Sequence, residues 1–91
     1  MRTYSGIVEN GDEFVTADVI EDWAYDDGWE IDDLYAITQG GDVDFEFVAN
    51  PPGNFDRGMQ EASLGILAIQ IERAHRKLEG IDTYVQWTNL G

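Results

Sequence analysis

The segment from Val43 to Ala49 constrains the fold more than any other part of this sequence. Its alternate residues are apolar and would lie on one side of an extended chain, and they are Val43, Phe45, Phe47 and Ala49. Asp44 and Glu46 fall on the other side. This alternation is typical of a strand with one buried face and one face in water. Other elements must cover the buried face, which favours an antiparallel sheet with helices packed on one side.

A long amphipathic helix is expected to cover the buried face of this sheet. The stretch from Asp56 to Glu79 begins with a good N-cap residue and ends before Gly80. Its apolar residues recur mostly at spacings of three and four, and they are Met59, Ala62, Leu64, Ile66, Leu67, Ile69, Ile71, Ala74 and Leu78. We expect this face to be buried. The single histidine, His75, is expected at the helix surface or boundary.

The first 28 residues predict two strands followed by a short helix. We expect strands at residues 2–8 and 13–15, joined by a tight hairpin at Asn10-Gly11. Thr16 is the expected N-cap, with Val15 and Ile20 forming a hydrophobic staple. Gly28 is the expected stop. The expected buried stripe of this helix is Ala17, Ile20, Trp23 and Ala24.

Two further strands complete the predicted sheet. Residues 29–38 indicate a strand that is bulged near Asp32-Asp33, where the apolar alternation changes phase. A turn at residues 39–42 would pair this strand with 43–49 as a hairpin. The last strand is expected at residues 81–90. The sequence therefore predicts one α+β domain over residues 1–91, in the order ββαββαβ, with a mainly antiparallel sheet and one short and one long helix packed on it.

Composition narrows the class of protein. The chain has 91 residues, of which 43% are hydrophobic, and this is enough for one modest core. It has no cysteine, which excludes disulfides, thiolate nucleophiles and cysteine-based zinc sites. No apolar run is long enough to span a bilayer, and no signal peptide is visible. These features predict a soluble cytoplasmic protein that acts in the host cell if a phage encodes it.

The charge is distributed unevenly along the chain. The formal net charge is -14, from 19 acidic and 5 basic residues. Between Thr3 and Asp56 there are 15 acidic residues and no Lys or Arg, whereas residues 57–91 contain four of each sign. This density of negative charge repels phosphate groups, so direct binding to nucleic acid or to an anionic membrane is not expected. It complements a basic protein partner instead.

The sequence offers no catalytic constellation. His75 lies within a long helix, and no Gly-x-Ser-x-Gly turn presents a nucleophile. Aligning Gly11, Gly28 or Gly41 with the invariant glycine of an EF-hand loop leaves its first position without an oxygen ligand. We therefore predict no enzyme activity and no cofactor. A cation site of another kind, built from Asp26, Asp27, Glu30, Asp32 and Asp33, stays open as an alternative.

The acidic residues suggest a phosphate-like surface. The candidate partner-binding residues are Asp18, Glu21, Asp22, Asp26, Asp27, Glu30, Asp32, Asp33, Asp44 and Glu46. On a helix, Asp18, Asp22 and Asp26 would recur about every 6 Å. On a strand, Asp44 and Glu46 would lie about 6.5 to 7 Å apart. Phosphates along a nucleic acid strand have a similar separation.

In size, charge and carboxylate spacing, the chain resembles small acidic inhibitors encoded by phages and mobile elements. These are the anti-CRISPR and antirestriction proteins and the uracil-glycosylase inhibitor, which act as DNA mimics. The resemblance implies a non-enzymatic inhibitor that occupies a basic nucleic-acid-binding site on a host defence protein. It rests on no shared motif, so it assigns no functional residues.

Other hypotheses stay open. An immunity protein or antitoxin that neutralises a basic nuclease toxin, similar in kind to barstar, would need the same charge. A halophilic domain would also be acidic, although the neutral charge of residues 57–91 argues against it. The oligomeric state is open, and a homodimer is compatible with the sequence. Tyr25, Trp29 and Tyr35 are either core residues or exposed binding anchors, and aromatic residues are more often core.

Overall fold

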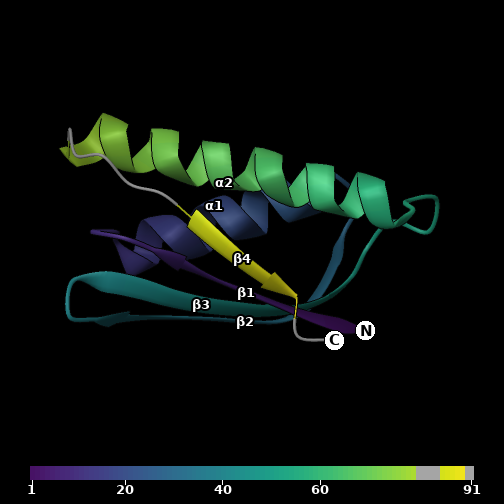
Figure 1. Ribbon diagram of the computed structural model, residues 1–91, viewed down its shortest axis with the longest axis horizontal. Helices are drawn as coiled ribbons and strands as arrows, with labels where there is room; N and C mark the ends of the chain where they lie inside the picture. The colour runs from purple at the N-terminus through teal and green to yellow at the C-terminus, as the bar shows by residue number, and fades with distance from the viewer. Residues whose placement is uncertain (80–84, 90–91) are drawn as a thin grey trace.

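The chain folds into a four-stranded sheet with two helices on one side, as Figure 1 shows. The computed structural model describes residues 1–79 and 85–89. In chain order the elements are β1 (Arg2–Val8), α1 (Glu13–Asp26), β2 (Glu30–Gln39), β3 (Asp42–Asn50), α2 (Arg57–Glu79) and β4 (Val85–Asn89). The sheet order is β2-β3-β1-β4, and each neighbouring pair is antiparallel. This is the split βαβ arrangement of ferredoxin-like folds. The α+β class and the antiparallel sheet are confirmed.

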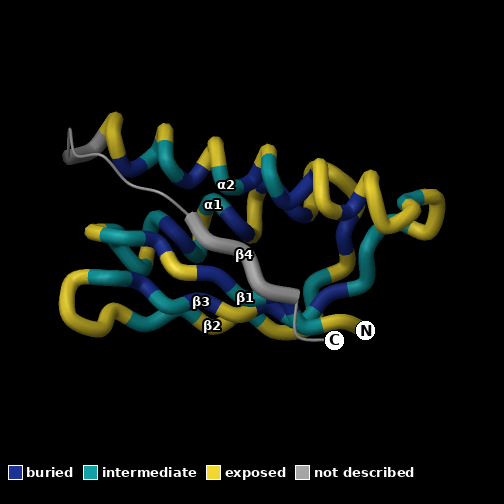
Figure 2. The backbone as a smooth tube through the Cα atoms, in the orientation of Figure 1, coloured by how far each residue is buried: buried dark blue, intermediate teal, exposed yellow. Residues whose placement is uncertain are grey.

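The core lies between the sheet and the helices. Along β3 the predicted alternation is confirmed, because Val43, Phe45, Phe47 and Ala49 are buried (Figure 2). The Tyr4 ring stacks on Phe47 with centroids 5.2 Å apart and meets Trp29 edge-on at the same distance. Such aromatic pairs add about 0.5–1.5 kcal/mol each beyond their buried area. Aromatic residues of β1 and β3, together with Trp29 just before β2, therefore pack at the centre of the sheet under the helices.

The β2–β3 hairpin forms as predicted, bulge included. The pairing register shifts between Ile31 and Asp33, so that Asp32 is the extra residue. Gly40 and Gly41 in the turn have φ values of 61° and 90°, a region that favours glycine. The bulge explains why the apolar alternation of β2 changes phase after Ile31.

The predicted strand at residues 13–15 and its hairpin are wrong, because α1 begins at Glu13. Asp12 is the N-cap, and its carboxylate accepts hydrogen bonds from the backbone N–H groups of Phe14 and Val15. Thr16 is a buried residue inside the helix, so neither its predicted N-cap role nor the staple built on it holds. Gly11 serves close packing: a Cβ at this position would lie 2.7 Å from Val8 Cγ1. The element order is βαββαβ.

The predicted end of α1 is confirmed. Gly28 has a φ of 88°, and the backbone N–H of Trp29 donates to the carbonyl of Ala24 over 2.8 Å. This six-to-one bond is typical of a glycine-terminated helix. Of the predicted stripe, Ile20, Trp23 and Ala24 are buried, whereas Ala17 is half-buried and Thr16 takes the buried position at the start of the helix.

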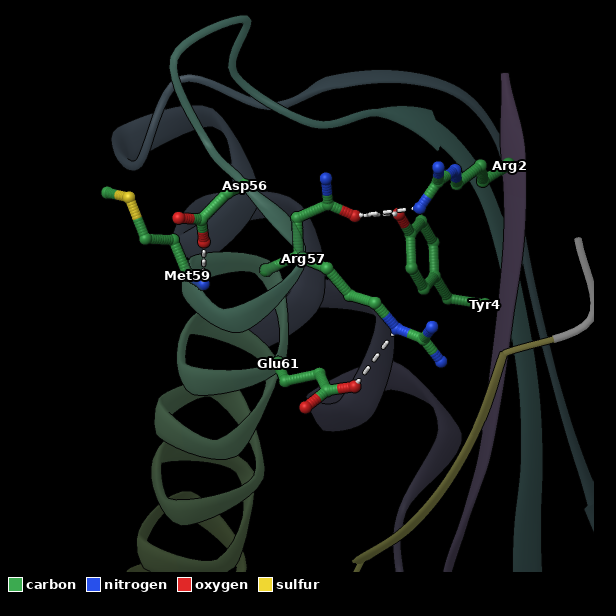
Figure 3. A network of polar contacts seen from close by, with 7 residues as sticks. Arg2, Tyr4, Asp56, Arg57, Met59 and Glu61 are labelled. Atoms are coloured by element: carbon green, nitrogen blue, oxygen red, sulfur yellow. Dashed lines mark hydrogen bonds and ion pairs between the residues drawn. The ribbon is translucent and has the colours of Figure 1, made fainter.

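The long helix begins where predicted but buries a different face. Asp56 caps α2 by accepting a hydrogen bond from the backbone N–H of Met59 over 2.8 Å (Figure 3). The residues buried beneath the helix are Gln60, Ser63, Leu64, Leu67, Ile71 and His75. Met59, Ile66 and Ile69 were predicted to be buried but are 44%, 52% and 49% exposed. Ala62 is exposed as well.

Hydrogen bonds explain this rotated face of α2. Gln60 Oε1 accepts from the Tyr4 hydroxyl over 3.3 Å and from Arg2 Nη1 over 3.1 Å (Figure 3). His75 Nε2 lies 3.2 Å from the Thr16 hydroxyl. Polar side chains can be buried when they are hydrogen-bonded. The predicted surface position of His75 is therefore wrong: the residue is fully buried between the helices.

The C-terminal strand falls partly within the described residues. Strand β4 covers Val85–Asn89, within the predicted strand at residues 81–90, and pairs with β1. Residues 81–84 and 90 lie outside the described residues, as does the side chain of Leu78. Among the helices that the structure describes, neither is long and apolar enough to cross a membrane.

Candidate protein-binding surface

The exposed side of α1 carries a row of carboxylates. Asp18, Glu21, Asp22 and Asp26 are all exposed, because Ile20, Trp23 and Ala24 take the buried stripe of the same helix. Within residues 1–79 and 85–89, none of these four side-chain carboxylates forms an ion pair or a hydrogen bond. No basic side chain of the described residues pairs with them, which leaves these carboxylates available to a cationic partner.

The next four candidate residues surround the turn from α1 into β2. Asp27 ends α1, and its Oδ2 accepts a hydrogen bond of 2.6 Å from the Ser63 hydroxyl of α2. Glu30, Asp32 and Asp33 are exposed on β2, which is an edge strand of the sheet. Asp33 Oδ1 accepts from the backbone N–H of Leu34. Asp27 and Asp33 thus have local structural partners, unlike the row on α1.

The last two candidate residues lie on the opposite face of the sheet. Asp44 and Glu46 alternate with the buried residues of β3, so they project from the face that the helices leave uncovered. Glu46 pairs in register with Tyr35, which is 57% exposed. A shallow hollow of about 280 Å³ lies here, lined by Ser5, Ile7, Tyr35, Asp44 and Glu46 among others. The structure therefore separates the ten candidates into three regions: the exposed side of α1, the turn with the edge strand β2, and the uncovered face of the sheet.

A groove between α1 and α2 adjoins the carboxylate row. Its volume is about 730 Å³. Asp22 and Asp26 line the α1 side, and Met59, Ala62 and Ile66 line the α2 side. The sequence pattern does not reveal this groove, because it predicts that all apolar residues of α2 lie in the core. The buried face also has a helical spacing, formed by Gln60, Ser63, Leu67, Ile71 and His75. Because this face mixes polar and apolar residues, hydrophobic periodicity does not identify it.

Two of the four basic residues of α2 form ion pairs within the helix. Arg57 pairs with Glu61 over 3.6 Å (Figure 3), and Arg76 pairs with Glu72 over 2.6 Å. Both pairs are separated by one helical turn and are largely exposed, so each contributes little to stability. These pairs place opposite charges next to one another on α2, in contrast to the row of like charges on α1.

The alternative cation site has no matching geometry. Within the part of the chain that the structure describes, no three His, Asp or Glu side chains converge as metal ligands would. Asp26, Asp27, Glu30, Asp32 and Asp33 are spread along the end of α1, the turn and the edge of β2. These carboxylates offer a charged surface for binding.

Comparison with known proteins identifies the fold. No protein-family model matches the chain, and no curated protein matches its sequence. An ACT domain protein from Streptococcus pneumoniae is similar in structure, with a TM-score of 0.57, 13% identity, and coverage of 98% of this chain and 89% of that chain. A formyltetrahydrofolate deformylase from Pseudomonas putida is also similar, with a TM-score of 0.57 and 14% identity. That match covers 94% of this chain but only 28% of the deformylase. At these identities the likeness concerns the ACT-like fold alone.

Proposed function

We propose that this chain is a non-enzymatic acidic inhibitor that binds a basic nucleic-acid-binding site on another protein through the exposed side of α1. The observation that carries the proposal is the row of Asp18, Glu21, Asp22 and Asp26, which have no counter-charge within the described residues. A row of this kind costs stability through self-repulsion, and a basic partner relieves that cost.

The spacing of the row supports a phosphate-like role. Asp18, Asp22 and Asp26 are each one helical turn apart, which corresponds to about 6 Å along the axis. A channel lined with Lys and Arg for phosphates can accept carboxylates at this separation. The sheet surface with Asp44 and Glu46 faces away from α1, so a flat partner cannot contact both surfaces together. We place the interface on α1 because it adjoins a groove of about 730 Å³ with Met59 and Ile66 on its other wall, whereas the hollow on the sheet surface measures about 280 Å³.

The partner class has two forms that share this chemistry. The DNA-mimic hypothesis predicts that the partner is a nucleic-acid-binding defence protein. A basic nuclease toxin is the form that the immunity-protein hypothesis names. Both require a basic site and competition with nucleic acid, so the identity of the captured partner separates them.

The test uses three charge-reversal variants and a lysate treated with nuclease. The first replaces Asp18, Asp22 and Asp26 with Lys, and the second replaces Asp44 and Glu46 with Lys. The control replaces Glu61 and Glu72 of α2 with Lys, because each of these two acids is already paired with an Arg of the same helix. We expect the wild type and the control to retain a basic protein identified by mass spectrometry, and the first variant to lose it.

Competition completes this test. Added DNA should displace the wild-type protein from the purified partner, and the wild-type protein alone should not shift DNA in a gel. Loss of the partner only in the second variant would place the interface on the sheet. Equal binding by all variants, or binding of DNA by the protein itself, would refute the proposal.

A further inference from the structure

The groove between α1 and α2 has two chemically different walls. The α2 wall is mainly apolar, although Ser63 and Gln70 also line it: Met59 and Ile66 are large hydrophobic residues that are 44% and 52% exposed. The α1 wall is acidic, with Asp22 and Asp26 at its rim. Val19 and the nearly buried Trp23 complete the lining on the α1 side. Among the described residues that line the groove there is no Lys or Arg. An occupant must therefore offer apolar surface on one side and positive charge on the other.

The groove is held open by contacts at both ends of the helix pair. Near the start of α2 the Ser63 hydroxyl donates to Asp27 Oδ2 over 2.6 Å. Toward its end His75 Nε2 lies 3.2 Å from the Thr16 hydroxyl. These contacts fix two antiparallel helices along their shared length. A preformed groove costs little reorganisation when a ligand binds.

The dimensions of the groove fit a short helix. Its α2 wall extends from Met59 to Gln70, which corresponds to about 16 Å at 1.5 Å per residue. This length matches roughly three turns of a second helix. An amphipathic helix that lays its apolar face into a hydrophobic groove is a recurrent mode of peptide recognition. Small anionic ligands are disfavoured by the acidic rim, and a second copy of this chain would bring its own acidic wall against the first.

We propose that the groove binds an amphipathic basic helix of the partner. In this arrangement apolar side chains of the partner contact Met59 and Ile66, while its Lys or Arg residues contact Asp22 and Asp26. The inference rests on the proposed function and deepens it, because apolar anchors add to the electrostatic contact of the α1 row. The partner's affinity should therefore persist in part at salt concentrations that screen exposed charges.

The test uses the full chain and two synthetic peptides of about four helical turns. The first has Leu at positions i, i+3, i+4 and i+7 on one face, and Lys and Arg along one edge. The second has the same net charge, with Ser in place of each Leu. Calorimetry should show that the wild-type protein binds the Leu peptide at least about tenfold more tightly than the Ser peptide. NMR shifts caused by the Leu peptide should include Met59, Ile66 and Trp23.

Matched variants locate the apolar contact. Ile66→Ser should weaken binding of the Leu peptide about tenfold, which is the usual effect of removing an interface anchor. Ile69→Ser is the control, because Ile69 is 49% exposed on the same helix but does not line the groove. It should leave the affinity unchanged. Asp22→Asn with Asp26→Asn should weaken binding and flatten its salt dependence. A melting curve recorded for each variant checks that the variant is folded.

The outcomes separate this inference from the proposed function. If both peptides bind equally and the α1 charge reversals abolish both, the acidic surface binds cations but the groove inference is wrong. If neither peptide binds, or if Ile66→Ser and Ile69→Ser have equal effects, the groove inference is also wrong, and the lysate experiment alone decides the proposed function. If sedimentation shows a wild-type dimer that Ile66→Ser dissociates, a second copy occupies the groove, which overturns the inference.

Discussion

At the scale of single residues, the surroundings of the Tyr4 side chain control the ionisation of its hydroxyl group. The side chain is 1% exposed, and its hydroxyl donates to Gln60 Oε1. Burial raises the pKa of Tyr4 above its ordinary value of 10.0, because the phenolate is poorly solvated there, while the nearby Arg2 acts in the opposite direction. The folded state therefore keeps Tyr4 protonated at a pH where the unfolded chain has begun to ionise.

This difference predicts a loss of stability in alkali. The contribution of Tyr4 is fully present below about pH 10, and it is lost as the pH rises from there through the raised pKa of the folded state. Urea unfolding between pH 8 and 11 measures it. Tyr4→Phe should lower the free energy of unfolding by about 1 kcal/mol at pH 8 and should remove this part of the alkaline decline. Tyr35→Phe is the control because Tyr35 is exposed. An identical decline in both variants would contradict the prediction.

At the scale of secondary structure elements, the edge strand β2 is protected by side chains. Edge strands expose unpaired N–H groups that can pair with other chains. Here Glu13 of α1 accepts hydrogen bonds from the backbone N–H and the hydroxyl of Thr38, over 3.1 and 3.2 Å. Asp33 occupies the N–H of Leu34, and the bulge at Asp32 interrupts the strand. The start of α1 therefore closes one end of this edge.

Removing the Glu13 carboxylate should open that end of β2. In Glu13→Ala we expect faster hydrogen exchange at the Thr38 amide and a loss of about 1 kcal/mol in the free energy of unfolding. Exchange at the central amides of β1 and β3 should follow only the global change. Glu21→Ala is the matched control, since Glu21 is an exposed acidic residue of the same helix. Unchanged exchange at Thr38 would show that Glu13 does not close the edge.

At the scale of the whole molecule, unbalanced charge is the dominant feature. The net charge of -14 belongs to residues that precede α2 in the chain, and the row on α1 has no basic partner among the described residues. Repulsion between these carboxylates opposes the compact state. Salt screens such repulsion over a Debye length of about 8 Å at physiological ionic strength.

The melting temperature should therefore rise with added NaCl. We expect the variant with Lys at positions 18, 22 and 26 to be more stable than the wild type at low salt by about 1 kcal/mol, or roughly 4–8 °C. Its stability should depend less on salt. Differential scanning calorimetry at several NaCl concentrations measures both quantities. A melting temperature that does not change with salt in either protein would show that the charges interact too weakly to affect folding.

The sequence by itself determined the features that depend on local chemistry. Alternation fixed the buried face of β3, Gly28 fixed the end of α1, and Asp56 fixed the start of α2, because each signal acts within a few residues. The bulge in β2 was visible as a change of phase. The asymmetry of charge was also readable, since it needs no coordinates. The helix start at Asp12 was missed because Asn10-Gly11 has the local signature of a hairpin, whereas close packing against Val8 decided its conformation.

Only the tertiary structure decided which face of α2 is buried. Met59 and Ile66 are more hydrophobic than Gln60 and His75, yet they are exposed, because Gln60 and His75 find buried hydrogen-bond partners on β1 and α1. Those partners lie 56 and 59 positions away in the chain, so no local pattern reveals them. The same packing divides the acidic candidates between the exposed side of α1, the edge strand β2 with the turn before it, and the uncovered face of the sheet. Burial depends on the elements that pack together. When two faces of a helix could both be buried, the helix buries the face whose polar groups find hydrogen-bond partners on the neighbouring elements.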